Sequence, residues 1–399
     1  MTTTQSDIFS KLATNHADAD GMLEEVIKHF RENRQAMEMF EAMKMRVRNR
    51  LNLPLLAAED APVSSEDIER QLESGLLDAC REAGVMLIED GRIGEGWMYL
   101  RPVADTELAK RLLSYIEITD DNYDEMVQVL LHEGVDVGRG FEAVLKHQGT
   151  CNSITLFEQA IVSRSKKDRQ AAAAKLLEHF YGELSALVRD DIAGRDKENP
   201  GATNADGTPQ TLGEMVLSRK WLLGEGGYHL DTTHLASVVR VASILDDPDA
   251  WKKAHELTQY GRRLHHQFQY PGEEPFVDFY PSYSAFYDVL LGNNVDAGLK
   301  LFERKARSVD SSQHGTSAIE TYVDLQNRTG RHAEAIEASI DLVPDDVPAQ
   351  RIVPMLIEIA RDSNDSAAFG PILAFCQKQN DVLGYAAVLH AQGATKSSS

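Results

Sequence analysis

The stretch from 317 to 342, SAIETYVDLQNRTGRHAEAIEASIDL, predicts two helices joined by a tight turn. The helices are expected at 317–328 and 332–342, where apolar residues recur at helical spacing. Between them stands Gly330, a residue type that commonly follows the end of a helix. This stretch therefore predicts a helix–turn–helix unit.

The same unit recurs along the chain. Residues 283–291 and 295–307 predict two helices around the turn Gly292-Asn293-Asn294, and residues 123–132 and 140–146 predict another pair around the turn 133–136. Further helices are expected at 20–50, which is predicted as one long helix, and at 350–361, 367–379 and 382–392. No run of alternating apolar and β-branched residues is long enough to predict a strand.

Small residues at 84, 91 and 96 are predicted to let two helices approach closely, the first ending near Gly91 and the second beginning near Gly94. Gly84, Leu87, Gly91, Gly96 and Leu100 stand at intervals that resemble the tetratricopeptide repeat, and so do Gly330 and Ala335. The resemblance covers about residues 76–105 and 283–345. The first Trp and the closing Pro of that repeat are mostly missing. The resemblance implies stacked helix pairs and a concave surface that holds a peptide or a partner protein.

We therefore predict an all-α fold in which stacked antiparallel helix pairs form a curved, right-handed α-α solenoid with one long loop insertion. The insertion is rich in Gly, Pro, Asn and Asp, as in GRDKENPGATNADGTPQ at 194–210, and leads to the glycine hinge at 224–227. The predicted parts are an N-terminal helical segment (1–60), helical repeats (61–192), an irregular loop and candidate lid (193–230), further repeats (231–392) and a disordered tail (393–399).

Composition excludes several classes of function. The 399 residues carry 41 Lys and Arg against 63 Asp and Glu, a net charge of −22, which argues against binding nucleic acid or anionic lipid. No apolar run approaches the roughly 20 residues that span a bilayer. Phosphate-binding glycine loops, dinucleotide fingerprints, EF-hand loops and paired CxxC motifs are absent from the sequence.

The cysteines and the N-terminus predict a cytoplasmic location. The three cysteines, Cys80, Cys151 and Cys376, are far apart and form no disulfide framework, so each is expected to act as a small buried apolar residue. The first 21 residues lack a basic segment followed by an apolar core, as a secretory signal would have.

One short stretch is a candidate metal site. His229, Asp231 and His234 fall within six residues at the predicted start of a helix, and imidazole nitrogen with carboxylate oxygen suits Zn, Mn or Fe. The structural alternative is that Asp231 caps the helix, His234 is an ordinary first-turn residue and His229 packs in a turn.

Other histidines stand at predicted helix ends and are hypothesised to converge with this group. They are His132, His147 and His265, the last at the end of a helix expected to begin near Asp249. A carboxylate close by, Glu133 or Glu225, is the candidate general base. The segment 270–281, dense in aromatics, prolines and carboxylates, predicts either a pocket for a polar ring such as a sugar or a rigid connection whose aromatics pack on neighbouring helices.

Two functions follow from these observations. The first is a non-catalytic scaffold that binds a peptide or protein on its concave face. The second is a divalent-metal-dependent enzyme, of hydrolase type, in which the metal activates water or polarises a small polar substrate. A scaffold predicts binding residues spread over several repeats, whereas an enzyme predicts one deep pocket with clustered His and carboxylate.

Overall fold

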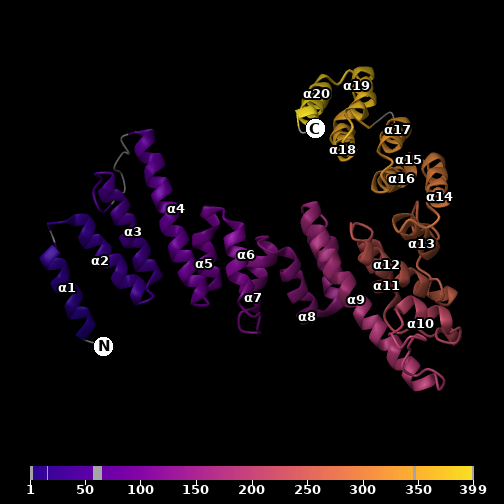
Figure 1. Cartoon of the computed structure of the whole chain (residues 1–399), viewed down its shortest axis with the longest axis horizontal. Coiled ribbons are helices and arrows are strands. Elements are labelled where there is room, and N and C mark those ends of the chain that lie inside the picture. The colour runs from indigo at the N-terminus through magenta and orange to yellow at the C-terminus, as the bar shows by residue number, and fades with distance from the viewer. Residues whose placement is uncertain (1–2, 16, 57–64, 345–346, 398–399) are drawn as a thin grey trace. The chain divides into compact units, whose positions relative to one another are not determined.

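The computed structural model describes residues 3–15, 17–56, 65–344 and 347–397 (Figure 1). In these residues the backbone forms helices, turns and loops, with two isolated bridges, Thr203 to Pro209 and Pro271 to Asp278, in place of any sheet. The all-α prediction is confirmed. The chain divides into two compact parts, residues 1–149 (unit 1) and 150–399 (unit 2), with the boundary at Gly149.

Unit 1 is built from helices that pack against their neighbours in the chain, α2 on α3, α3 on α4 and α4 on α5. Its elements are α1 (Thr3–Asn15), α2 (Ala19–Glu32), α3 (Ala36–Arg50), α4 (Glu66–Glu89), α5 (Ile93–Leu100), the 3₁₀-helix η1 (Arg101–Val103), α6 (Thr106–Ser114), α7 (Tyr123–Val127), the π-helix η2 (Gln128–His132) and α8 (Val137–Leu156), which kinks at Gly149 and continues into unit 2.

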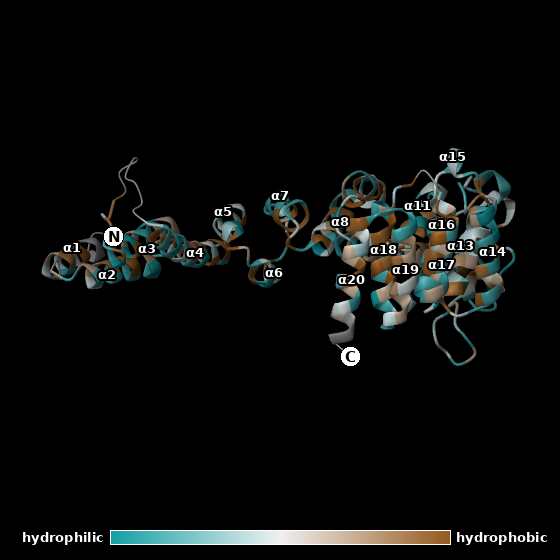
Figure 2. Cartoon of the chain, turned by 90° about the horizontal axis from the view of Figure 1, so that it is seen from above, coloured by the Kyte–Doolittle hydropathy of each residue, from teal (hydrophilic) through white to brown (hydrophobic). Residues whose placement is uncertain are grey.

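In unit 2, too, helices pack against their neighbours in the chain, α12 on α13, α16 on α17 and α19 on α20. Helices such as α13, α16 and α18 carry both apolar and polar residues (Figure 2). Such helices bury one face and leave the other in water. Its elements are the π-helix η3 (Phe157–Ile161), α9 (Lys166–Arg195), α10 (Leu212–Ser218), η4 (Gly224–Gly226), α11 (Thr232–Ala242), α12 (Pro248–Gly261), η5 (His266–Phe268), α13 (Phe279–Leu290), α14 (Val295–Ser308), α15 (Ser311–His314), α16 (Ser317–Arg328), α17 (His332–Leu342), α18 (Ala349–Asp362), η6 (Ser366–Ala368), α19 (Phe369–Lys378) and α20 (Val382–Ser397).

The helix–turn–helix units predicted from the sequence are confirmed. The bounds of α16 and α17 are the predicted ones, and Gly330 between them has a φ of 77°, in the left-handed region that favours glycine. In the part of the chain that the structure describes, no helix is both long and apolar enough to cross a bilayer.

The close approach predicted between the helices on either side of Gly91 is confirmed for Gly84 and Gly96. It is wrong for Gly91, where a Cβ would meet nothing within 4 Å and whose φ of 78° makes it a turn residue. A Cβ added to Gly84 in α4 would lie 2.9 Å from the carbonyl oxygen of Gly96 in α5, and a Cβ on Gly96 would lie 2.9 Å from the carbonyl oxygen of Gly84. The two backbones therefore touch at this crossing, and neither position has room for a side chain.

The single helix predicted at 20–50 is wrong. The chain turns at Arg34, whose φ is 55°, so that α2 and α3 are separate helices that pack on one another. Apolar residues recur at helical spacing on both sides of the turn because α2 and α3 bury their apolar faces in the same core. There Ile27, Met39 and Met43 pack with Leu87 of α4. Arg34 is held by hydrogen bonds to Asp90, Glu89 and the Met86 carbonyl.

The long connection after α9 is tied down by hydrogen bonds. Arg219, only 6% exposed, donates from Nε to Asp196 at 2.8 Å and from Nη1 to the side chain of Gln210 at 2.7 Å. The backbone N–H of Asn199 and the guanidinium of Arg219 lower the pKa of Asp196, because both favour its carboxylate form. Thr211 and Glu214 then form a capping box at the start of α10.

The aromatic residues at and after Phe276 pack among the helices of unit 2. Phe276 stacks on Tyr283 with ring centroids 3.9 Å apart, and Tyr283, Phe286 and Tyr287 are all buried. The Tyr287 hydroxyl donates to the carbonyl of Val239 at 2.7 Å. These contacts support the packing interpretation of the segment rather than a sugar pocket.

Candidate functional site

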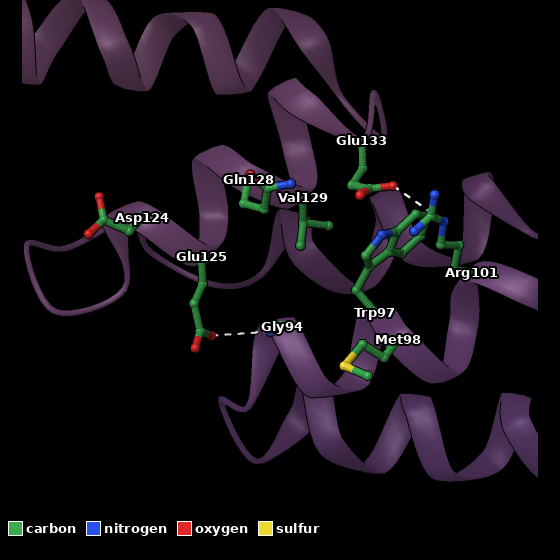
Figure 3. A pocket seen from close by; sticks show the side chains of 9 residues that line it. All are labelled: Gly94, Trp97, Met98, Arg101, Asp124, Glu125, Gln128, Val129 and Glu133. Atoms are coloured by element: carbon green, nitrogen blue, oxygen red, sulfur yellow. Dashed lines mark hydrogen bonds and ion pairs between the residues drawn. The ribbon is translucent and has the colours of Figure 1, made fainter.

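A pocket of about 540 Å³ lies in unit 1 between α5 and the continuous stretch α7–η2 (Figure 3). Its floor is apolar, with Trp97, Met98 and Val129, and its rim is charged, with Arg101 and three carboxylates. The residues that line it are Gly94, Trp97, Met98, Arg101, Asp124, Glu125, Gln128, Val129 and Glu133.

One wall follows directly from helix geometry. Gly94, Trp97, Met98 and Arg101 are spaced by three, one and three residues, so they share one face of α5 and its continuation η1. The opposite face of α5, with Ile93, Gly96 and Leu100, is buried against α4.

The other wall contains a π-helix. In η2 the N–H of Glu133 donates to the carbonyl of Gln128, five residues earlier, at 2.9 Å. Wide turns of this kind occur frequently at functional sites. The wide turn places Glu133 one turn beyond Gln128 and Val129, so that all three side chains line the pocket.

Two of the rim carboxylates are bound to the facing wall. Glu133 lies 3.5 Å from the guanidinium of Arg101, and Glu125 accepts a hydrogen bond from the N–H of Gly94 at 3.2 Å (Figure 3). Gly94 is in the first turn of α5, where a carboxylate is favoured by the helix dipole. With Asp124 the rim holds three carboxylates and one cation, so it is negatively charged.

The floor has an exposed apolar side chain and an unused donor. Met98 is 74% exposed, although it stands beside the indole of Trp97. The Trp97 Nε1 is buried and has no hydrogen-bond partner among the described residues. A buried N–H without an acceptor costs about 1–3 kcal/mol.

Of the residues predicted as functional from the sequence, Glu133 alone lines this pocket. His132 precedes it as the last residue of η2. His147, in α8, stacks on Tyr123 with ring centroids 4.1 Å apart, and its Nδ1 is 3.8 Å from the exposed carboxylate of Asp120. The Tyr123 hydroxyl in turn accepts a hydrogen bond from Gln148 at 3.0 Å.

His229 belongs to a hydrogen-bonded chain in unit 2. Its Nδ1 is 2.9 Å from the hydroxyl of Tyr260, and its Nε2 is 3.3 Å from a carboxylate oxygen of Asp191. The Tyr260 hydroxyl also accepts from the backbone N–H of His229 at 2.9 Å. Burial raises the pKa of Tyr260 well above its ordinary value, so the phenol stays neutral. This chain fixes the loop before α11 onto α9 and α12.

Asp231 caps α11, as the structural alternative predicted. Its Oδ1 accepts from the N–H of Thr233 at 2.8 Å, from the Thr233 hydroxyl at 2.6 Å and from the N–H of His234 at 3.2 Å. The hydrogen bond from the Thr233 hydroxyl contributes most to lowering the pKa of Asp231, because it stabilises the carboxylate form. His234 is a half-buried residue in the first turn of the helix.

His265 lies outside the helix that it was predicted to end. α12 ends at Gly261, because the Gln269 side chain donates to the carbonyls of Gly261 and Leu264 and caps the helix there. The exposed ring of His265 packs on His266. Glu225 is part of η4, and its side chain lies outside the described residues.

Across residues 3–397, apart from the gaps at 16, 57–64 and 345–346, no three His, Cys, Asp or Glu side chains gather as a group that would hold a metal ion. The His229 ring bonds to Tyr260 and Asp191, and the Asp231 carboxylate caps α11. His132 and His147 belong to unit 1, whereas His229, His234 and His265 belong to unit 2.

Of the cysteines, Cys376 is buried, Cys80 is half-buried and Cys151 is exposed, so the prediction of a buried role is wrong for Cys151.

Comparison with models of known protein families, with curated protein sequences and with solved structures finds no match to this chain.

Trp97, Met98, Arg101 and Val129 were missed as site residues in the sequence. One signal was available for Met98. The buried stripe of α5 is set by Ile93, Gly96 and Leu100, so Met98 stands off that stripe and is expected to be exposed. Val129 carries no such signal, because only the packing of α5 against η2 makes it part of a pocket.

Proposed function

We propose that the protein is a helical-repeat interaction scaffold that binds a peptide or protein segment, with the pocket of unit 1 as an anchoring site. The observation that carries this proposal is the exposed Met98 beside the unpartnered Nε1 of Trp97. An apolar side chain of the partner would cover Met98, and a partner carbonyl would accept from Trp97.

The charge of the rim supports a basic partner. Asp124, Glu125 and Glu133 surround the pocket with only Arg101 among them, and the whole chain has a net charge of −22. Complementary charge speeds association and selects among partners. The expected ligand is therefore an extended segment with a large apolar residue next to Lys or Arg.

Selection of random peptides displayed on phage against the full-length chain tests this proposal. The enriched peptides are synthesised and titrated by calorimetry into the wild type, the Met98→Glu variant and the Leu217→Glu variant. Leu217 is a matched control, because it is 60% exposed and lies in unit 2. Burial of a methionine side chain contributes about 1.5–3 kcal/mol, so Met98→Glu is expected to raise Kd at least about tenfold.

A second readout places the peptide. The chain has three tryptophans, and Trp97 is the one that lines the pocket. Peptide binding is expected to change the indole emission of the wild type and to leave that of Trp97→Phe unchanged. Failure to enrich any peptide, or equal affinity for the Met98→Glu and Leu217→Glu variants, would refute the proposed site.

A further inference from the structure

A groove in unit 2 is independent of the pocket described above. It lies between α14, α16 and α17 and has a volume of about 390 Å³. Its α17 wall is acidic, with Glu334, Glu337 and Asp341 spaced by three and four residues. Side chains at these intervals share one face of a helix.

Two of the three cations that line the groove are already paired with carboxylates. Arg331 lies 2.6 Å from Asp296, and Arg307 lies 3.0 Å from Glu303. Lys300 is the third cation of the lining. The three α17 carboxylates make no ion pair or hydrogen bond to any residue in the described part of the chain, so the groove retains an excess of negative charge.

A buried amide adds a neutral acceptor to this charge. Gln326 of α16 lines the groove and is only 4% exposed, and its Oε1 has no hydrogen-bond partner within the described residues. The Gln326 amide interacts with the hydroxyl of Tyr322, itself 7% exposed, at its other end. A buried acceptor without a donor is destabilising, and an N–H from a ligand removes that penalty.

We propose that this groove binds an arginine side chain of a basic peptide segment from a partner protein. A guanidinium carries five N–H donors in one plane and no acceptor, which matches a site made of carboxylates and an amide oxygen. Gln326 accepts one N–H, and the α17 carboxylates bind the charge. An ammonium group provides the charge but not the planar set of donors, so lysine binds more weakly.

Fluorescence anisotropy of a labelled peptide, Gly-Ser-Arg-Gly-Ser-Arg-Gly-Ser, with the full-length chain at low ionic strength tests the proposal. The triple variant Glu334→Gln, Glu337→Gln, Asp341→Asn is expected to bind about tenfold more weakly, as the loss of three exposed charge pairs predicts. Gln326→Leu, which keeps every charge, is expected to bind about fivefold more weakly, because it removes the buried acceptor. The thermal melt of the triple variant should match the wild type, and a single cooperative melt of Gln326→Leu shows that this variant is folded.

Two controls separate this site from general attraction to an acidic protein. The triple variant Glu66→Gln, Glu69→Gln, Glu73→Gln changes the net charge equally, but in α4 of unit 1, and is expected to bind like the wild type. A peptide with citrulline in place of arginine is expected not to bind. The proposal is overturned by equal weakening in the two triple variants, by undiminished binding to Gln326→Leu, by tight binding of the citrulline peptide, or by no binding of the arginine peptide.

Discussion

Gly96 offers a direct test of how unit 1 is packed. A Cβ at this position would lie 2.5 Å from the Ile88 side chain, 2.9 Å from the carbonyl oxygen of Gly84 and 3.0 Å from the backbone nitrogen of Ile88. Two of these three atoms belong to the backbone of α4, so no side-chain rotation relieves the contact. Gly96→Ala must therefore move α5 away from α4.

The magnitude is best obtained against a second glycine of the same helix. A Cβ on Gly94 would meet nothing closer than the Glu125 carboxyl at 3.6 Å. Gly94→Ala should thus stabilise α5 by about 0.5–1 kcal/mol, the ordinary gain of alanine over glycine in a helix. Gly96→Ala has a similar gain from helix propensity but loses about 1–3 kcal/mol to overpacking. The two variants are expected to differ by that overpacking cost.

Hydrogen–deuterium exchange of the amides in α4 and α5 measures this difference. It reports local stability and does not require the two units to unfold in one step. A cost of 1–3 kcal/mol corresponds to exchange about 5- to 150-fold faster in Gly96→Ala than in Gly94→Ala. Amides of unit 2 serve as an internal reference and should not change. Equal exchange rates in α4 and α5 of the two variants would show that the helices do not touch at Gly84 and Gly96.

Three further predictions concern the stretch around the start of α11. His229→Ala removes the imidazole partner of the Tyr260 hydroxyl and one of the two side-chain partners of Asp191, which keeps its ion pair with Arg195. Unit 2 is expected to lose about 1–3 kcal/mol of stability, seen as a lower Tm in calorimetry. Elemental analysis of the wild type and of His229→Ala/His234→Ala decides the metal hypothesis, because Zn, Mn or Fe near one per chain that disappears in the variant would favour the enzyme over the scaffold. Asp231→Ala is expected to lower stability by about 0.5–2 kcal/mol at neutral pH, whereas Asp231→Asn keeps the cap. The folded-state pKa of Asp231 lies below its ordinary value, so the stability from the cap is complete above that ordinary value and is lost as the pH falls through the folded-state pKa. The difference in Tm between wild type and Asp231→Ala should therefore close in strong acid. A difference that stayed constant would contradict the cap.

Local signals were enough to predict much of the helical structure. Helix bounds such as those of α16 and α17 depend on apolar period and on a glycine at the turn, both of which are visible in the sequence. The turn at Arg34 has neither Gly nor Pro, so it was missed; contacts of Arg34 with the end of α4 hold it in place. Capping by Asp231 was also predictable, because it involves only the next three residues.

The candidate site could not be predicted from the sequence, because it depends on residues that are distant in the chain. Its floor and rim come from α5 and from α7–η2, and Trp97, Val129 and Glu133 meet only when these helices pack. His229 shows the same limit. Its neighbours in sequence suggested a metal site, yet the partners of its ring are Asp191 from α9 and Tyr260 from α12.

The sequence by itself determined that the chain is helical, where helices such as α16 and α17 begin and end, and that α4 and α5 approach closely at glycines. These properties depend on backbone hydrogen bonds and on side chains a few residues apart. The tertiary structure alone decided which polar groups are paired, which acceptors and donors stay unused, and which carboxylates share a groove, because those depend on side chains that only packing brings together.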